Sequence, residues 1–303
     1  MAPVLIGTGA AILTVVRFGD TPRVHAEYLP GSTIGRADTI FWGWAQAGQA
    51  VLALLVALAL QVAVNYANDY SDGIRGTDDD RVGPFRLTGS GAAEPAQVKA
   101  AAFAAFGVAA VAGLALIAWS GHWWLLAVGV LCILGAWYYT GGRRPYGYSG
   151  LGEVSVFVFF GLVATLGTTY TQIGAITAVA VLGAIGTGAL ACAVMVANNL
   201  RDEPKDALVG KNTLAVRLGA ARTRTFFAVL IGTPFVLTLA IAPSAGWALI
   251  ALAALPLARG PLQAVLGGRE GAGLLPALAG TGRLDLVWSA LLAIGLVLSG
   301  PVF

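Results

Sequence analysis

Long apolar runs, separated by short polar or glycine-rich segments, make up most of the chain. A helix needs about 20 apolar residues to cross the hydrocarbon core of a bilayer. Nine runs approach that length, the first and eighth being short, near residues 2–17, 39–67, 95–119, 122–140, 151–169, 175–200, 222–242, 244–258 and 283–300. No polar stretch is long enough to hold a core of its own. We therefore predict an all-α membrane protein of nine transmembrane helices, with one integral domain over residues 1–303.

The composition also indicates a polytopic membrane protein. The chain is 57% hydrophobic and 11% charged, with a mean hydropathy of +0.79, whereas soluble domains are about 25% charged. The net charge of +3 does not indicate a nucleic-acid partner, because basic loops in such a chain reflect topology and anionic lipid. Cys132 and Cys192 lie inside apolar runs, so we interpret both as small buried hydrophobic residues.

Charged residues are concentrated on one side of the predicted bundle. That side receives the loops around residues 68–94, 141–150, 201–221 and 259–282, which with the adjoining helix ends carry 15 of the 18 Lys and Arg residues. By the positive-inside rule this side is cytoplasmic. It also holds 12 of the 15 acidic residues. We expect a multi-pass protein of the plasma membrane whose active surface faces the cytoplasm.

Two clusters of asparagine and aspartate lie where long apolar runs end. The first contains Asn65, Asn68, Asp69 and Asp72, and the second contains Asn198, Asn199, Asp202 and Asp206. Positions i, i+3, i+4 and i+7 share one face of a helix, so each cluster should present a stripe of oxygen atoms. Carboxylates at membrane depth are functional by default, and oxygen ligands at this density are typical of Mg²⁺ bound to substrate phosphates. The clusters therefore predict a site for a phosphorylated substrate at the membrane surface.

The spacing of the clusters indicates an internal repeat. They are 133 residues apart and end the second and sixth predicted helices, so that four crossings separate them. An even number of crossings brings both clusters out on the same side, as in a duplicated four-helix unit. Internal repeats with sites at their interface are common in membrane proteins. We expect a parallel four-helix repeat.

The segments that follow the clusters contain further candidates. Asp78–Asp80 either supply extra ligands or form a solvated loop, and Arg81 is a candidate for substrate binding. Lys211 lies between a glycine and an asparagine, and for this residue we favour a charge-assisted bond to phosphate. Phosphate binding and lipid anchoring are equally open for the basic residues that follow, Arg217, Arg222 and Arg224.

A third segment, residues 138–148, combines tyrosines, glycines and paired arginines. The rings of Tyr139 and Tyr146 could stabilise a developing cation, and Arg143 and Arg144 could neutralise a leaving diphosphate. The same residue types are typical of aromatic belts and snorkelling anchors at a membrane interface. Both interpretations are open from the residues alone.

Other kinds of site find little support in the sequence. His25 and His122 have no evident partner, and the sequence contains no Ser-His-Asp arrangement, zinc-ligand spacing or nucleotide-binding glycine loop. A cation-coupled transporter would also carry carboxylates near a repeat interface. It would place them near the bilayer midplane, whereas both clusters here lie at helix ends on one side, which favours an enzyme.

Three motifs in order resemble one family: NDYSDGIRGTDDDR, YTGGRRPYGYSGLGE and NNLRDEPKDALVGKNTLAVRLG. With APVLIGTGAA and VFVFFGLVATLGTTYTQ, they make nearly the whole chain similar to the UbiA superfamily of intramembrane prenyltransferases. Within that superfamily the chain looks most like the 1,4-dihydroxy-2-naphthoate polyprenyltransferases of menaquinone synthesis, of the actinobacterial type.

The resemblance implies both a fold and a reaction. The fold is a nine-helix bundle around a central cavity that is capped on the cytoplasmic side. The reaction is the Mg²⁺-dependent transfer of a prenyl group from an all-trans polyprenyl diphosphate to 1,4-dihydroxy-2-naphthoate, with loss of diphosphate and CO₂ to give demethylmenaquinone. The alternatives are other aromatic acceptors, such as 4-hydroxybenzoate or the rings used by the chlorophyll and haem branches.

The resemblance also implies roles for single residues. The two aspartate-rich motifs supply the expected catalytic Mg²⁺ ligands, Asp69, Asp72, Asp202 and Asp206. Tyr139 sits where the family carries a tyrosine followed by a basic residue, and we expect it to be catalytic. The expected substrate-binding residues are Asn65, Asn68, Arg81, Arg143, Arg144, Tyr146, Asn198 and Lys211.

The chain departs from the family pattern at two places. The ubiquinone branch has a further aspartate four residues after Asp72, where this chain has Gly76, as suits the menaquinone branch. Relatives open with a basic, Arg-Pro-containing segment before the stretch that matches Ala2-Pro3-Val4, and here Met1 stands in that place. We expect either a misassigned start or the loss of substrate contacts on the first helix.

Overall fold

The computed structural model describes residues 1–18, 43–76 and 85–300, and within these residues it contains helices but no strand. His25, Asp78–Asp80 and Arg81 lie outside the described residues. In chain order the elements are α1 (Ala2–Phe18), α2 (Trp44–Gly73), α3 (Pro95–Ser120), α4 (Leu125–Thr140), η1 (Tyr146–Ser149), α5 (Gly152–Val156), η2 (Phe157–Val163), α6 (Ala164–Ile173), α7 (Ala178–Leu208), α8 (Leu214–Ile241), η3 (Gly246–Ala254), α9 (Leu255–Leu266), η4 (Gly271–Leu274) and α10 (Leu275–Leu298).

Seven helical spans in the described residues are long and apolar enough to cross a membrane. Three of them are composite: α5, η2 and α6 form Gly152–Ile173, η3 and α9 form Gly246–Leu266, and η4 and α10 form Gly271–Leu298. Two shorter apolar helices, Ala2–Leu13 and Leu125–Thr140, bring the number within the described ranges to nine. The predicted all-α, polytopic membrane fold is therefore confirmed.

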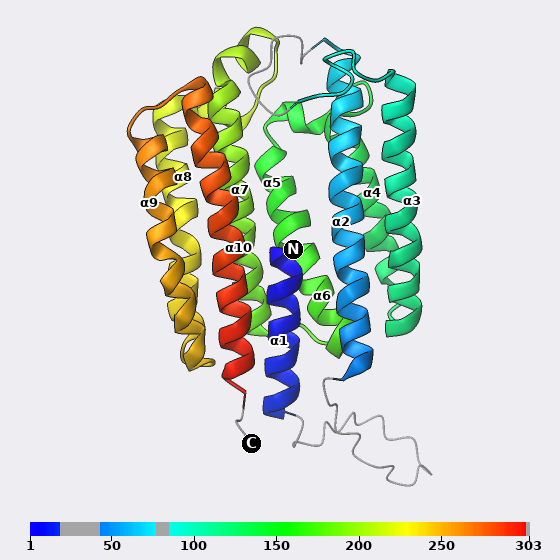
Figure 1. Cartoon of the computed structure of the whole chain (residues 1–303), viewed down its shortest axis with the longest axis vertical. Helices are drawn as coiled ribbons and strands as arrows, with labels where there is room; N and C mark the ends of the chain where they lie inside the picture. Colours follow the sequence, from blue (N-terminus) through cyan, green and yellow to red (C-terminus); the bar gives the residue numbers. More distant parts are fainter. Residues whose placement is uncertain (19–42, 77–84, 301–303) are drawn as a thin grey trace.

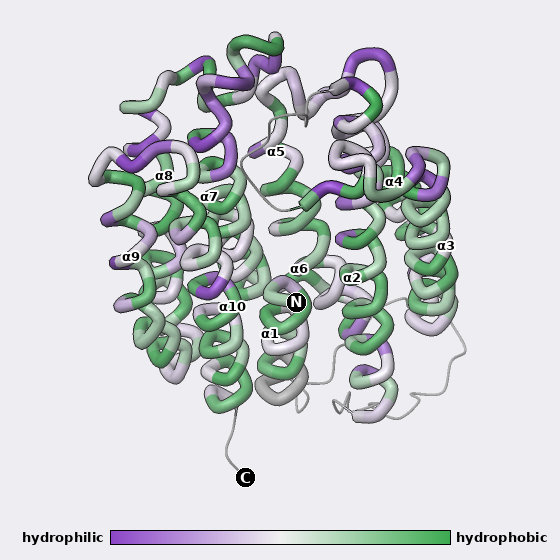
Figure 2. The backbone as a smooth tube through the Cα atoms, turned by 45° about the horizontal axis from the view of Figure 1, so that its top comes forward, coloured by the Kyte–Doolittle hydropathy of each residue, from purple (hydrophilic) through white to green (hydrophobic). Residues whose placement is uncertain are grey.

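The helices form two groups with a central element between them. Helices α2, α3 and α4 gather on one side and α7 to α10 on the other, while α1 and the span from α5 to α6 lie between (Figure 1). The cluster-bearing helices α2 and α7 run in the same direction and finish at the same end of the bundle (Figure 1). Hydrophilic residues collect at that end (Figure 2). This arrangement agrees with the predicted parallel repeat, which stays a prediction.

Both cluster-bearing helices are longer than the apolar runs predicted. Helix α2 continues through the first cluster to Gly73, and α7 continues through the second, past Pro204, to Leu208. An apolar run stops at its first polar residue, but the backbone hydrogen bonds of a helix do not depend on side-chain polarity. The two clusters therefore lie on the last turns of helices, where the backbone fixes the direction of each side chain.

The segment predicted as a cytoplasmic loop, residues 259–282, is largely helical. Helix α9 occupies its first part, and η4 with α10 occupies its second. As a result, Arg283 and Asp285, which stand at the start of the predicted run 283–300, lie near the middle of α10. The Asp285 carboxylate accepts hydrogen bonds from the hydroxyls of Thr187 at 3.0 Å and Ser289 at 3.4 Å. These partners lower the penalty of a polar group at membrane depth.

Small residues bring α7 close to the span that precedes it. A Cβ atom on Gly161 of η2 would lie 2.6 Å from the Cα of Gly188 and 3.0 Å from the carbonyl oxygen of Ala184, both on α7. Only glycine permits this approach, which is typical of helix pairs in membranes. The contact fixes α7, and with it the second cluster, against the span that begins at α5.

We expect Gly161→Ala to destabilise the bundle, because the added methyl group must push two backbones apart. Overpacking of this kind costs about 1–3 kcal/mol. The matched control is Gly167→Ala on α6, where a Cβ would have no atom within 4 Å. Thermal unfolding in detergent measures both variants. A lower midpoint for Gly161→Ala alone is the expected result, and equal midpoints for the two variants would contradict it.

Candidate active site

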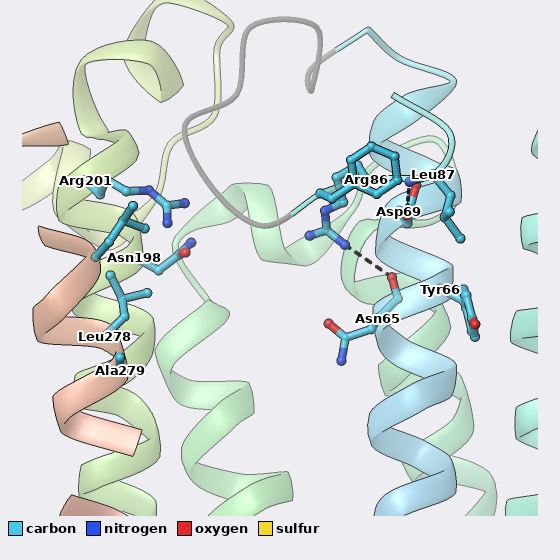
Figure 3. Close-up of a pocket in the computed structure, with 11 residues that line it drawn as sticks. Asn65, Tyr66, Asp69, Arg86, Leu87, Asn198, Arg201, Leu278 and Ala279 are labelled. Atoms are coloured by element: carbon cyan, nitrogen blue, oxygen red, sulfur yellow. Dashed lines mark hydrogen bonds between the residues drawn. The ribbon is translucent and has the colours of Figure 1, made fainter. Parts of the chain in front are cut away.

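Two neighbouring cavities open between the ends of α2 and α7. The smaller, of about 150 Å³, is here called the polar cavity. Its acidic and amide lining residues are Asn68, Asp72, Asn198, Asn199, Asp202 and Asp206. The larger, of about 620 Å³, is here called the large cavity and is bordered by α2 on one side and by α7 and α10 on the other (Figure 3). Asn198 and Arg86 line both cavities, so the two adjoin.

The first cluster divides between these cavities. Asn68 and Asp72, one turn apart, line the polar cavity, whereas Asn65 and Asp69, also one turn apart, line the large cavity. At 3.6 residues per turn the two pairs are offset by about 60° around α2. The single stripe that we predicted is therefore a pair of adjacent stripes with different surroundings.

The pair that faces the polar cavity is held by hydroxyl donors from other elements. Tyr148 of η1 donates its hydroxyl to the carboxylate of Asp72, which is only 6% exposed. The hydroxyl of Thr140, at the end of α4, donates to the amide oxygen of Asn68 at 2.8 Å. These contacts bring the predicted ligand Asp72 to the same wall as the segment that follows α4.

Asp69 is placed differently from the other three aspartates. Its two carboxylate oxygens accept hydrogen bonds from the backbone N–H groups of Leu87 at 2.8 Å and Thr88 at 2.9 Å, and the side chain is 5% exposed. The carboxylate therefore fixes the start of the segment that leads to α3. The same segment carries Arg86, which reaches the backbone oxygen of Asn65 at 3.4 Å (Figure 3). A metal-ligand role for Asp69 stays a prediction, and the geometry favours a positioning role.

The second cluster is compensated mainly by its own helix. The guanidinium of Arg201 donates to both carboxylate oxygens of Asp202, at 2.7 and 2.6 Å. Nη1 of Arg201 is buried without a hydrogen-bond partner among the described residues, although Arg201 lines the large cavity (Figure 3). Asn198 contributes a long contact of 3.5 Å from its amide nitrogen to Asp202.

Basic residues line the polar cavity beside the carboxylates. Asp206 is 8% exposed and lies in this lining with Lys205 and Lys211. The ammonium nitrogen of Lys211 lies 4.5 Å from the centroid of the Tyr148 ring, within cation–π range. The predicted placement of Lys211 at the site thus agrees with the structure, and Lys205 adds a second ammonium group.

The Tyr/Arg segment contributes fewer residues than we expected. Tyr139 lines the polar cavity, and its hydroxyl donates a hydrogen bond to the thioether sulfur of Met195 at 3.6 Å. Tyr146 instead donates to the carbonyl oxygen of Gly135 at 2.7 Å, and burial raises the pKa of its hydroxyl. Arg143 and Arg144 are exposed and line neither cavity. The geometry therefore supports Tyr139 and gives the other three no contact with the cavities.

Several arginines near the site hold helix ends together. Arg75 donates to the carbonyl oxygens of Thr140 and Gly142, which ties the end of α2 to the end of α4. Arg217 donates to the carbonyl oxygen of Ser149 at 2.9 Å. This contact is neither of the two roles left open for Arg217, and phosphate binding and lipid anchoring both stay predictions.

Sequence reasoning missed several of the cavity residues, and four of them, Lys205, Tyr148, Arg86 and Arg201, lie beside the aspartates or basic groups of the site. Lys205 follows Asp202 at i+3, so its helical position could have indicated it. Tyr148 differs from the chosen Tyr146 by two residues, and only the 3₁₀ turn of η1 decides which ring faces the cavity. Arg86 and Arg201 carry no signal in the pattern, because their positions depend on the Asp69 contact and on the Asp202 pair.

The oxygen ligands around the polar cavity suit Mg²⁺ that is held jointly by the protein and a substrate. They do not form a complete metal site made by the protein alone. No group of three His, Cys, Asp or Glu side chains in the described part of the chain converges as a ready ligand set. Mg²⁺ is usually held by one or two carboxylates together with waters and substrate phosphates. Asp72, Asp202 and Asp206 around one cavity supply such hard oxygen ligands, with amide oxygens from the asparagines beside them.

Comparison with known proteins identifies the family. Residues 36–267, which are more than half of the chain, match the family described as "UbiA prenyltransferase family". The chain belongs to the UbiA prenyltransferase family. It is 49% identical to the 1,4-dihydroxy-2-naphthoate octaprenyltransferase of Mycobacterium tuberculosis, over 97% of this chain and 90% of the relative. The enzyme of the same name from Mycobacterium leprae is 52% identical, over 84% and 86% of the two chains.

A solved structure agrees with this fold. The apo structure of a UbiA homolog from Aeropyrum pernix K1 superposes with a TM-score of 0.57 at 15% identity and covers 97% of this chain and 96% of that one. At this identity the likeness speaks for the fold alone. The UbiA resemblance drawn from the three sequence motifs is confirmed, including its similarity to enzymes named for the naphthoate acceptor.

We expect Asp69→Asn to loosen the segment after α2, since an asparagine can accept only one of the two backbone N–H groups. Loss of one buried hydrogen bond costs about 1–3 kcal/mol, so the amides of Leu87 and Thr88 should exchange hydrogen about 10-fold faster or more. The matched control is Asp72→Asn, which contacts Tyr148 instead. Hydrogen-exchange mass spectrometry over residues 85–90 compares the two. Equal exchange in both variants would count against the anchoring role.

Proposed function

We propose that this chain transfers the polyprenyl group of an all-trans polyprenyl diphosphate to 1,4-dihydroxy-2-naphthoate, in a Mg²⁺-dependent reaction of menaquinone synthesis. The observation that carries the proposal is that Asp72 of α2 lines the same cavity as Asp202 and Asp206 of α7, at the polar end of a membrane bundle. The relatives at 49% and 52% identity, named for this acceptor, supply its identity.

The basic residues of the two cavities suit a diphosphate. Lys205 and Lys211 line the polar cavity, and Arg201 lines the large cavity with a buried nitrogen that has no hydrogen-bond partner in the described residues. An unpartnered buried donor is costly, and a phosphate oxygen would satisfy it with a charge-assisted bond. These residues would bind the diphosphate and stabilise it as it departs.

In this proposal Asp72, Asp202 and Asp206 would hold Mg²⁺, with Asn68 and Asn198 beside them. When bound, Mg²⁺ supplies Lewis-acid neutralisation of the diphosphate charge. Asp202 gives up part of its contact with Arg201 in this arrangement, which leaves the guanidinium available to the same diphosphate.

The large cavity suits the prenyl chain. Its α10 wall consists of Leu275, Leu278 and Ala279, while its polar residues come from α2, α7 and the segment at Arg86. An allylic diphosphate has the same division, with a charged head and a hydrocarbon tail. The apolar wall would hold the tail and exclude water that could trap the allylic cation.

The reaction balances without an oxidant or reductant. The bond between the allylic carbon and the diphosphate oxygen breaks, and both electrons leave with the diphosphate. The electron-rich ring then forms a carbon–carbon bond to the allylic carbon. Loss of CO₂ returns the electrons of the carbon–carboxylate bond to the ring and restores aromaticity, which gives demethylmenaquinone in its quinol form. Tyr139, which lines the polar cavity, would face the developing cation with its ring.

The orientation follows from the distribution of charge. Both clusters lie at the end of the bundle that carries most of the basic residues, and the positive-inside rule makes this end cytoplasmic. A plasma-membrane enzyme that meets soluble dihydroxynaphthoate on the cytoplasmic side, and a lipid-borne donor from the bilayer, fits this arrangement.

The first test uses purified protein in detergent or lipid with dihydroxynaphthoate, octaprenyl diphosphate and Mg²⁺, with or without EDTA. The expected result is metal-dependent formation of a prenylated naphthoquinol with release of diphosphate and CO₂, detected by mass spectrometry. Parallel reactions with 4-hydroxybenzoate test the acceptor. Product from 4-hydroxybenzoate alone would replace the naphthoate assignment, and failure with every aromatic acceptor would remove the proposed function.

We expect Asp72→Asn and Asp202→Asn to lower turnover by about 100-fold or more, because metal-assisted stabilisation of the departing charge is worth several kcal/mol. The matched control is Asp285→Asn, which changes an intramembrane aspartate outside both cavities and keeps an acceptor oxygen for Thr187. Initial rates at saturating substrate, together with unfolding midpoints, compare the variants. Near wild-type rates for Asp72→Asn would argue against the two-helix metal site.

A further inference from the structure

One buried carboxyl group next to the site is not used by the mechanism above. Glu153, on the first turn of α5, is 5% exposed. Its Oε1 accepts a hydrogen bond from the amide nitrogen of Asn199 at 2.8 Å. Its Oε2 is buried without a hydrogen-bond partner among the described residues. Such a group is expensive to bury, so its presence calls for a function.

The position of Glu153 beside α7 is fixed by contacts that do not involve its carboxyl group. The thiol of Cys192 on α7 donates to the backbone oxygen of Glu153 at 3.1 Å. Further along the same span, Gly161 and Gly188 allow the two backbones to touch. The register between α5 and α7 therefore holds the carboxyl group against the side chain of Asn199.

This contact determines which atom Asn199 can offer to a ligand. Asn199 is 8% exposed and lines the polar cavity. One N–H of its amide donates to Glu153, which holds the side chain in one of its two flipped orientations, so that Oδ1 points away from Glu153 and can accept a hydrogen bond. An accepting oxygen recognises a donor such as a hydroxyl group, and it repels a phosphate.

The depth of Asn199 indicates which part of the substrates it meets. Asn199 lies seven residues before Asp206 on α7, which is about 10 Å further from the polar end at 1.5 Å per residue. The diphosphate is expected beside Asp202 and Asp206, and the allylic carbon and the attacking ring lie deeper. Tyr139, whose hydroxyl contacts the thioether of Met195 one turn further along α7, lines the same cavity.

We propose that Asn199, oriented by Glu153, recognises a phenolic hydroxyl of the aromatic acceptor. Glu153 is a positioning residue in this arrangement, because it acts through the amide of Asn199. The inference rests on the proposed function and deepens it, since it assigns the acceptor subsite to the wall that α5 and α7 form together.

The test compares steady-state constants of Glu153→Leu, Glu153→Gln, Asn199→Ala and Cys192→Ala with the wild type. We expect Glu153→Leu and Asn199→Ala to raise KM for dihydroxynaphthoate about 10-fold, from the loss of one hydrogen bond to substrate, with KM for octaprenyl diphosphate and the Mg²⁺ dependence unchanged. Glu153→Gln keeps an accepting oxygen for Asn199 and should restore most of the affinity. Cys192→Ala, at the same helix contact, should leave both KM values unchanged.

Two results in this series would overturn the proposal. A parallel rise of both KM values with a lower unfolding midpoint would show a purely structural role for Glu153. Loss of turnover in Glu153→Gln at unchanged KM would show that Glu153 moves a proton instead of positioning Asn199.

A second experiment, which pairs acceptor analogues with Asn199→Ala, keeps the proposal testable if Glu153→Leu fails to fold. Inhibition constants of 1-hydroxy-2-naphthoate, 4-hydroxy-2-naphthoate and 2-naphthoate are measured on the wild type and on Asn199→Ala. Removal of the recognised hydroxyl should weaken wild-type binding about 10-fold and leave Asn199→Ala unaffected, because a site built for a hydroxyl discriminates against its loss. Equal losses in both proteins for each hydroxyl would overturn the inference.

The wild-type control separates this inference from the proposed function. Turnover with another phenolic acceptor and none with dihydroxynaphthoate would remove the naphthoate assignment, and the same KM pattern on that acceptor would still support Asn199. Turnover of dihydroxynaphthoate with unchanged KM in every variant would keep the function and reject the inference. A wild type that prenylates no phenolic acceptor would reject both.

Discussion

Carboxylates at the membrane end of a helical bundle need partners, because a buried charge without one costs several kcal/mol even after relaxation. The partners in this chain come from different places. Asp69 takes two backbone N–H groups, Asp72 takes a tyrosine hydroxyl from η1, and Asp202 takes the guanidinium of the residue before it. Since most of these partners lie on other segments, compensating the charges also assembles the walls of the cavities.

The partners differ in how readily a substrate could replace them. Two backbone N–H groups are part of the folded chain, so the Asp69 contact belongs to the scaffold that carries Arg86. Asp72 accepts a tyrosine hydroxyl from a neighbouring segment, and the Arg201–Asp202 pair can open toward a diphosphate that offers the guanidinium equivalent oxygen atoms. Residues of one motif, NDYSD, thereby serve both the fold and the chemistry.

The sequence was sufficient for the class of fold and for the end of the bundle that carries the site, because apolar length and charge distribution are properties of whole segments. It failed where a choice depends on a neighbouring element. Helical spacing could not show that Asp69 and Asp72 face different cavities, since the difference comes from the segment at Leu87. Tyr146 is expected at the site instead of Tyr148 because a 3₁₀ turn is invisible in the pattern.

The order of residues along α7 fits the order of the groups that the proposed reaction brings together. Asp206 and Asp202 lie nearest the polar end, Asn199 follows one turn deeper, and Met195 lies deeper still. In the proposed function the diphosphate, the reacting allylic carbon and the acceptor ring would follow one another in the same direction. The match requires α7 to stay helical through its polar last turns and to touch the neighbouring span at Gly188. The tight helix contact in the membrane and the chemistry at its surface are therefore parts of one arrangement.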